Sequence, residues 1–314
     1  MYAGRLRNQV SFMLSACNFY MPIFEEALDA YGLPLELRYL PIIESALNPS
    51  AVSRAGASGL WQFMIGTGKI YGLESNSLVD ERRDPIKATW AAARYLKEMY
   101  DIYGDWNLVI AAYNCGPGTI NKAIRRANGE TDYWKIYNYL PKETRGYVPA
   151  FIAANYVMTY YCDHNICPME TNIPASTDTV QVNKNLHFEQ IADLCNVPLD
   201  QIKSLNPQYK KHMIPGDSKP YTLRLPIDAI STFIDKQDTI YAHRADELFR
   251  NRKTVAVKEI TPSTRKTTAA VAGKGKLTYY TIKSGDTLST IAGKYGVTIK
   301  DIQRWNGMSN TKIA

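Results

Sequence analysis

Residues 35–49 read Leu-Glu-Leu-Arg-Tyr-Leu-Pro-Ile-Ile-Glu-Ser-Ala-Leu-Asn-Pro, and they decide how the N-terminal part of the chain folds. At helical spacing one apolar stripe runs through Leu33, Leu37, Leu40 and Leu47, and Glu44 lies on the same stripe. Burying an unpaired carboxylate is costly, so such a group tends to keep its proton and its pKa rises. A carboxyl protonated near neutral pH suits a general acid. The alternative is a glutamate at the stripe's edge that pairs with an arginine or caps the next segment.

The composition is that of a soluble globular protein. Its 314 residues are enough for two or three domains, and 45% hydrophobic and 21% charged residues are ordinary values. The formal charge of +7 favours anionic partners such as nucleic acid, anionic lipid or an acidic cell-wall polymer. Between Arg250 and Lys283, however, nine Lys and Arg residues stand against one acid, so the surplus is largely one tract. The 22 tyrosines supply flat rings that can stack on sugars or fill cores.

The five cysteines are an odd number without a repeated spacing, and they predict no disulfide framework. Cys162 and Cys167 can pair or stay reduced. With His164 they form an incomplete zinc pattern, because a fourth ligand is missing nearby. We therefore expect no metal site.

The sequence contains no run near the roughly 18 apolar residues of a membrane span. Arg5 and Arg7 precede the apolar run 10–16 and then Cys17, in the manner of a lipoprotein signal. That run contains two serines and barely reaches the lower limit of about 7 residues for a signal core. We expect it to belong to the first helix, and the chain to lack its export signal.

An all-helical domain is expected over residues 18–161, a length that fits one hydrophobic core. The glycine-rich segment from Ala51 to Gly72 permits close backbone approach, as one wall of a cleft would require. No Asp or Glu occurs from Ser45 to Leu73, so Glu44 has no second acid close behind it. Caps, first-turn prolines and apolar periodicity place the helices at 18–31, 34–48, 84–103, 106–114, 119–127, 133–139 and 143–161.

Beyond a proline- and threonine-containing linker at 163–178, the chain carries a repeat with a spacing of 100 residues. The residue pattern of each copy predicts a short strand, a helix, a turn and a second helix, which is followed by an Asn. The first copy, 178–226, ends in a closing strand at 221–225. The matching strand of the second copy, 279–314, falls beyond the last residue, so that copy looks cut short.

Residues 227–278 separate the two copies. The first part, to about residue 250, is expected to form a helix whose Ile230, Phe233 and Ile234 pack on the first copy. Residues 251–276 are rich in Lys, Thr, Ala and Val with little periodicity, and they predict a flexible basic tether.

Four motifs in the helical domain form an ordered set. They are Glu44-Ser45, Gly59-Leu60-Trp61-Gln62-Phe63, Ala112-Tyr113-Asn114-Cys115-Gly116-Pro117-Gly118 and Arg145-Gly146-Tyr147-Val148-Pro149. This set resembles the catalytic domain of soluble lytic transglycosylases, specifically the membrane-bound lytic murein transglycosylase D family. The repeats resemble LysM carbohydrate-binding modules. The second is the clearer copy, because the first has Asn185-Leu186-His187-Phe188 where Gly-Asp-Thr-Leu is usual.

The resemblance implies a mainly α fold: a lysozyme-like all-helical catalytic domain followed by small α+β modules of βααβ order. It also implies cleavage of the β-1,4 bond between N-acetylmuramic acid and N-acetylglucosamine in peptidoglycan. Glu44 is then the catalytic acid, and the substrate's own N-acetyl group takes the place of a second carboxylate. Glu44 next acts as a base on the muramic 6-hydroxyl and closes a 1,6-anhydro ring. No metal or organic cofactor is implied.

The same resemblance assigns five residues to the substrate site: Ser45, Gln62, Tyr113, Asn114 and Tyr147. Tyr147 is expected to orient Glu44 by a hydrogen bond, Asn114 and Gln62 to contact acetamido groups, and Ser45 to position the leaving sugar. Without the resemblance, Tyr147 reads as a core aromatic, Asn114 as a helix C-terminal residue and Gln62 as a surface amide. Trp61 and Phe63 are expected to pack in the core.

Three rival functions remain open from the sequence. A hydrolytic muramidase of the same fold would use a second carboxylate, and Asp80, Glu81, Asp84 and Asp105 are candidates. A non-catalytic wall-binding protein would use the helical domain as a scaffold. A nucleic-acid role for the basic tract lacks an aromatic platform or recognition motif. We expect peptidoglycan glycan strands as the partner, no nucleic acid, a monomer, and a place in the periplasm or cell envelope, with outer-membrane association as an option.

Overall fold

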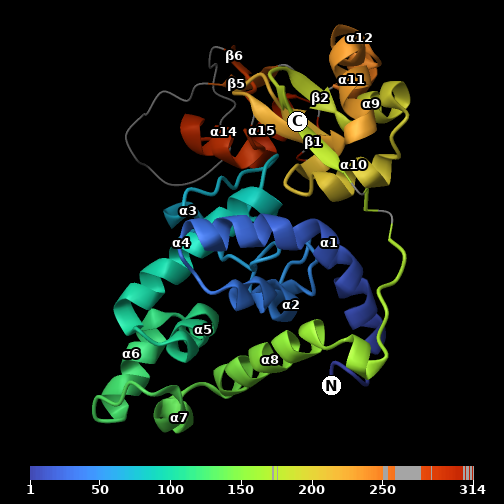
Figure 1. The fold of residues 1–314 in the computed structure, drawn as a ribbon. Coiled ribbons are helices and arrows are strands. Elements are labelled where there is room, and N and C mark those ends of the chain that lie inside the picture. The colour runs from blue at the N-terminus through green and yellow to red at the C-terminus, as the bar shows by residue number, and fades with distance from the viewer. Residues whose placement is uncertain are drawn as a thin grey trace, which may run out of the picture. The chain divides into compact units, whose positions relative to one another are not determined.

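The structure is a computed structural model that describes residues 1–171, 173–174, 176–249, 254–258, 277–283, 285–306, 308, 311 and 313. Its contacts divide the chain into two units. The first unit comprises Met1–Ser75, Asp80–Ser176 and Ser204–Gln208, and the second comprises Asn76–Val79, Thr177–Lys203 and Tyr209–Ala314. Each unit is described by itself below, with the labels of Figure 1.

The first unit is helical, as predicted. It packs α1 on α4, α4 on α5, and α5 and α2 on α8, and Figure 1 shows α2 between α1 and α8. Short 3-10 turns join or extend these helices. The elements are α1 (Arg7–Ala30), η1 (Leu35–Tyr39), α2 (Leu40–Ser45), α3 (Ile65–Ile70), η2 (Glu81–Arg83), α4 (Pro85–Tyr103), α5 (Trp106–Cys115), α6 (Pro117–Arg126), α7 (Tyr133–Ile136), η3 (Tyr137–Tyr139), α8 (Lys142–Thr159) and η4 (Cys162–His164).

Helix α1 begins eleven residues before the predicted start at residue 18, and it includes the apolar run 10–16 as expected. Val10 and Met13 are buried in the core of this unit. The segment after α8 is fixed on α1, because Ser15 donates a hydrogen bond to the carbonyl of Met169 and the amide of Met169 donates to Ser11. The first part of the expected linker is therefore docked on the helical domain.

The stretch that carries Glu44 differs from the single helix expected at 34–48. It forms η1 and then α2, which ends at Ser45. Proline has no amide hydrogen to donate along a helix, so the helix restarts at Leu40, with Pro41 in its first turn where no such bond is needed. Ala46 and Leu47 then adopt left-handed backbone angles, with φ of 51° and 59°. The apolar stripe itself is confirmed: its four leucines are buried.

The loop from Gly56 to Phe63 is held by a buried ion pair. Arg82 and Asp80 lie 2.8 Å apart, and the Arg82 guanidinium also donates to the carbonyls of Gly56 and Phe63, both at 2.9 Å. Gly59 has a φ of +87°, and a Cβ there would overlap the Arg82 carbonyl oxygen. The predicted close backbone approach is confirmed at this glycine.

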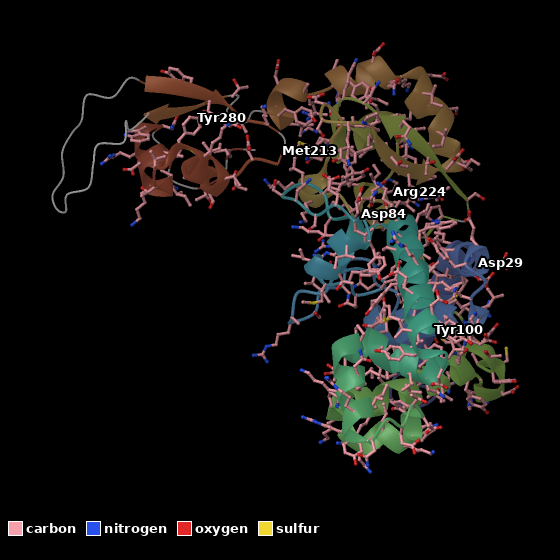
Figure 2. The ribbon with its side chains drawn as sticks, turned by 90° about the vertical axis from the view of Figure 1, so that its left-hand side faces the viewer. Asp29, Asp84, Tyr100, Met213, Arg224 and Tyr280 are labelled. Carbon is pink, nitrogen blue, oxygen red and sulfur yellow. The ribbon has the colours of Figure 1, made fainter. Side chains whose placement is uncertain are left out.

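Helix α4 is capped as the sequence predicts. The Asp84 carboxylate accepts hydrogen bonds from the amides of Ile86 and Lys87, both at 3.0 Å, and Pro85 occupies the first turn. Near the other end lies Tyr100, which is labelled in Figure 2. It stacks on Trp106 of α5, with 4.2 Å between ring centroids. This stacking joins the end of α4 to the start of α5.

The second unit contains the expected first repeat copy. Its strands pair antiparallel, β1 with β4 and β2 with β3, and the small β2–β3 pair was not predicted. The region expected to be one helix at 227–250 is three short ones, with Phe233 buried but Ile234 57% exposed, so the packing role of Ile234 is wrong. The elements are β1 (Thr177–Val182), β2 (Asn185–His187), α9 (Phe188–Cys195), α10 (Leu199–Leu205), η5 (Lys210–His212), β3 (Met213–Pro215), β4 (Tyr221–Pro226), α11 (Ile227–Asp235), α12 (Gln237–Ala242) and α13 (Ala245–Leu248).

The core of this unit is completed by four residues from much earlier in the sequence, Asn76–Val79. Leu78 and Val79 are buried in one cluster with Phe188 and other residues of the repeat. The amide of Lys210 donates to the Leu78 carbonyl at 2.7 Å. A short piece of the chain inside the expected helical domain therefore folds as part of the repeat.

The second copy contains β6 (Leu277–Thr281), α14 (Leu288–Tyr295) and α15 (Ile299–Trp305). Strand β6 pairs antiparallel with β5 (Thr254–Lys258), so the predicted tether is wrong over these five residues. Backbone pairing overrides the low periodicity there, since strand hydrogen bonds need no particular side chain. The rest of the expected tether, 251–253 and 259–276, lies outside the described residues.

The Gly59 packing predicts a large effect of a single methyl group. We expect Gly59→Ala to lower the free energy of unfolding by more than about 2 kcal/mol, because the new Cβ collides with backbone and alanine resists a positive φ. Gly118→Ala in the first turn of α6 is the matched control, since among the described residues nothing outside its chain neighbours and its own helix backbone lies within 4 Å of its Cβ position. Urea unfolding measures both, and equal effects of the two variants would contradict the close approach.

Candidate active site

Glu44 lies in the last turn of α2, half-buried beside α8. The Tyr147 hydroxyl donates a hydrogen bond to Glu44 Oε1, which is the contact expected from the sequence. The pKa of Glu44 is raised to about 7 as the net result of three causes: burial raises it, the Tyr147 hydrogen bond lowers it, and the negative charge of Glu143 raises it. Within the described part of the chain Glu44 pairs with no Arg or Lys and caps no helix. Its carboxyl can hold or release a proton near neutral pH.

Two tyrosines lie around this carboxyl. Burial and the Glu44 charge raise the pKa of both Tyr147 and Tyr113 well above the usual value, so both hydroxyls stay protonated. The Tyr113 hydroxyl donates to the Trp61 carbonyl at 2.7 Å, which joins α5 to the glycine-rich loop. Tyr147 thus faces the acid directly, whereas the hydroxyl of Tyr113 is used on the backbone.

Ser45 and Gln62 use their donors on the backbone of the glycine-rich loop. The Ser45 hydroxyl lies 2.9 Å from the Leu60 carbonyl and 3.1 Å from that of Pro41. The Gln62 amide nitrogen donates to the carbonyls of Gly59 at 2.8 Å and Ala51 at 3.2 Å. Both side chains therefore hold the loop in place beside Glu44. Their oxygen atoms remain as hydrogen-bond acceptors for a ligand.

Asn114 joins α5 to the first turn of α8, where its Oδ1 accepts a hydrogen bond of 2.9 Å from Thr144. The residue before Thr144 is Glu143, an exposed acid whose charge acts on Glu44. Sequence reasoning missed Glu143, because the packing of α2 on α8 brings the two acids together across about a hundred residues. Its only signal was its position just before the Arg145–Pro149 motif.

The four acids named above as candidates for a hydrolytic site all make structural contacts. Asp80 pairs with Arg82, and Glu81 accepts from the Glu74 amide at 2.8 Å and pairs with Lys87. Asp84 caps α4 and Asp105 caps α5. Trp61 and Phe63 are buried, so their predicted packing role is confirmed.

The described residues hold no group of three or more His, Cys, Asp or Glu placed to bind a metal. Cys162 and Cys167 do not form a disulfide, and both are exposed. No helix among the described residues is long and apolar enough to cross a bilayer.

Comparison with known families now adds to this geometry. Residues 21–136, which contain Glu44, the glycine-rich loop and the Tyr113-Asn114 pair, match the family described as Transglycosylase SLT domain. This part of the chain is similar to transglycosylase SLT domains. Residues 176–242 match the LysM-like domain of lytic transglycosylase MltD, and residues 280–314 match the LysM domain. The resemblance drawn from the four motifs and the repeats is confirmed.

Two curated relatives with longer chains are similar to this chain. The membrane-bound lytic murein transglycosylase D of Escherichia coli (strain K12) is 33% identical over 286 residues, which are 90% of this chain and 58% of that protein. The soluble lytic murein transglycosylase of the same strain is 33% identical over 124 residues, 38% of this chain and 19% of its own. The chain therefore spans less than two thirds of the length of either.

One solved structure, the 70 kDa soluble lytic transglycosylase of Escherichia coli, aligns with 46% of this chain and 24% of its own. Its sequence identity is 29% and its TM-score is 0.40.

The raised pKa of Glu44 predicts a pH-dependent cost to stability. Unfolding returns the carboxyl to its ordinary pKa near 4.5, so the folded state binds the proton more tightly and stability falls as pH rises from about 4.5 to about 7. We expect Glu44→Gln to raise the free energy of unfolding by about 1–3 kcal/mol at pH 8 and by almost nothing at pH 4. Urea unfolding at both pH values measures this.

The matched control is Glu26→Gln, on the exposed side of α1. Its charge stays in water, so a gain that depends on pH in the same way would show that the effect does not come from burial of Glu44.

The Tyr147 hydrogen bond makes a second prediction. Because that bond favours the charged carboxylate, Tyr147→Phe should raise the pKa of Glu44 above about 7. Carbon-13 NMR titration of the Glu44 side chain measures the shift. Tyr113→Phe is the matched control, since the Tyr113 hydroxyl bonds to Trp61 instead. A Glu44 pKa that is unchanged by Tyr147→Phe would contradict the assigned contact.

Proposed function

We propose that this chain is a peptidoglycan lytic transglycosylase. It cleaves the β-1,4 bond between N-acetylmuramic acid and N-acetylglucosamine and forms 1,6-anhydro-N-acetylmuramic acid. The observation that carries this proposal is Glu44, an acid with a pKa of about 7 next to a tyrosine donor, inside an SLT domain. The curated relatives named above are lytic murein transglycosylases, which supports the same activity.

The reaction needs one protein carboxyl. Protonated Glu44 gives its proton to the glycosidic oxygen, and the bond from that oxygen to the muramic C1 breaks. The carbonyl oxygen of the sugar's own N-acetyl group bonds to C1 in place of a second carboxylate. Glu44, now a carboxylate, takes the proton of the 6-hydroxyl, O6 bonds to C1 and the acetyl oxygen leaves. Glu44 regains its proton, and no water is consumed.

Tyr147 acts on Glu44 both when Glu44 serves as an acid and when it serves as a base. As a neutral donor it stabilises the Glu44 carboxylate that forms after the first proton transfer. Desolvation raises the pKa of Glu44 and the hydrogen bond lowers it. A net pKa of about 7 allows this one carboxyl to serve first as an acid and then as a base. We assign Tyr147 this role and assign Tyr113 to the wall that covers Glu44.

The hydrogen bonds that Gln62, Asn114 and Ser45 make within the protein limit which of their atoms can contact the substrate. Gln62 offers its Oε1 to an acetamido N–H, because its amide hydrogens are used on Gly59 and Ala51. Asn114 offers its amide N–H groups, because its Oδ1 accepts from Thr144. Ser45 offers its oxygen to a hydroxyl of the leaving sugar.

The later domains supply binding to the wall. We propose a catalytic domain at 18–161 and LysM-type modules at 178–226 and 279–314 that hold glycan strands. Such a protein acts on peptidoglycan in the periplasm or cell envelope, and we propose that it works as a monomer without a cofactor.

The hydrolytic rival now centres on Glu143, the acid whose charge reaches Glu44. Mass spectrometry of released muropeptides separates the two mechanisms, because anhydro products are one water lighter than hydrolysed ones. We expect anhydro products from the native chain and also from Glu143→Gln. Products with a reducing-end muramic acid alone would overturn the transglycosylase proposal.

Glu44→Gln tests the acid assignment in the same assay. We expect it to reduce muropeptide release by at least about a hundredfold, the lower end for loss of general acid–base catalysis, while binding to sacculi stays nearly intact. A non-catalytic wall-binding protein would release nothing in either form. Undiminished release by this variant would show that another group is the acid.

A further inference from the structure

Three aromatic residues that are at least partly exposed follow one another closely along α7 and η3. Trp134 is 55% exposed, Tyr139 is 46% exposed, and Tyr137 is partly exposed. Trp134 and Tyr137 lie nearly parallel, with 21° between their planes and 6.2 Å between centroids. We propose that these three residues, the aromatic platform, bind a pyranose ring of the glycan strand at a subsite beyond the reacting bond. This inference rests on the proposed function and extends it.

The platform is braced from beneath. Tyr133 is buried, meets the Trp134 ring edge-on at 4.9 Å, and donates its hydroxyl to the Arg145 carbonyl at 3.0 Å. Asp132 caps α7 by accepting from the Trp134 amide at 2.8 Å. An exposed tryptophan on a fixed backbone loses little conformational freedom on binding, which favours a binding role over chance exposure.

Arg145 joins the platform to the helix that holds the acid's partner. Its guanidinium donates to the carbonyls of Leu140 at 2.9 Å and Asn138 at 2.8 Å, and it lies over the Tyr137 ring at 5.7 Å. Two residues later on the same helix, Tyr147 bonds to Glu44. The first turns of α8 thus contact both the platform, through Arg145, and the acid, through Tyr147.

The chemistry and size of the platform select a sugar. A pyranose ring presents a face of C–H groups that can stack on one aromatic ring. The exposed side chain of Tyr139 suits contact with the hydroxyl groups of the sugar. A protein partner would need about 800 Å² of contact surface, and exposed polar residues Lys135, Asn138 and Lys142 interrupt the apolar area here. A glycan strand is the ligand that fits both limits.

Binding to an uncleaved ligand tests the platform. The full chain with Glu44→Gln is titrated with β-1,4-linked N-acetylglucosamine oligomers of increasing length, and tryptophan fluorescence is followed. We expect Trp134→Ala in that background to weaken binding of long oligomers about threefold to tenfold and to leave the disaccharide unaffected. Trp134→Phe keeps a flat ring and should retain most of the affinity, although it removes the Trp134 part of the fluorescence change.

The matched control is Tyr160→Ala, an aromatic residue of similar exposure at the other end of α8. Its affinity should equal that of the parent at every length. Equal affinity of Trp134→Ala and its parent for all oligomers, with both folded by circular dichroism, would overturn the platform. This outcome is separate from failure of the proposed function, which is judged by the products that the native chain releases from peptidoglycan.

Discussion

The first unit depends on the contact between Glu44 and Tyr147, where surrounding protein shields the Glu44 carboxyl from water. Desolvation and the Glu143 charge raise the Glu44 pKa, and the tyrosine hydroxyl lowers it, so the pKa settles at about 7. Desolvation and the Glu143 charge favour the protonated form of the carboxyl, and the hydrogen bond favours the charged form. The helices of the first unit hold Glu44 and Tyr147 together, because α2 packs on α8 and α8 packs in turn on α5.

The glycine-rich loop is the second support of the site. Ser45, Tyr113 and Gln62 all direct hydrogen bonds to its carbonyls, and the buried pair of Arg82 and Asp80 holds it from the other side. Removing one partner of a buried ion pair is expensive, so this clamp fixes one arrangement of the loop. Ser45, Tyr113 and Gln62, which the sequence assigns to substrate binding, thus also have a structural role. They can contact a substrate only through the atoms that do not already bond to the loop.

Much of this site is predictable from sequence because it follows short-range rules. Helical periodicity identifies Glu44 as misplaced on an apolar stripe, and cap residues such as Asp84 and Asp105 locate the helix starts. Glu143 and the aromatic platform are not predictable in this way, because their relation to Glu44 comes from the packing of α2 on α8 and from the side chain of Arg145. Likewise the share of Leu78 and Val79 in the second unit's core depends on tertiary contacts between distant segments, which periodicity does not encode.

We propose that a lone acid, Glu44, drives an internal ring closure with no water as nucleophile. Cleavage of peptidoglycan in water labelled with heavy oxygen is the decisive experiment. We expect the muramic acid ends released by the native chain to carry no heavy oxygen, because O6 of the same sugar bonds to C1. One heavy oxygen at each new muramic acid end would contradict it and would assign a hydrolytic mechanism instead.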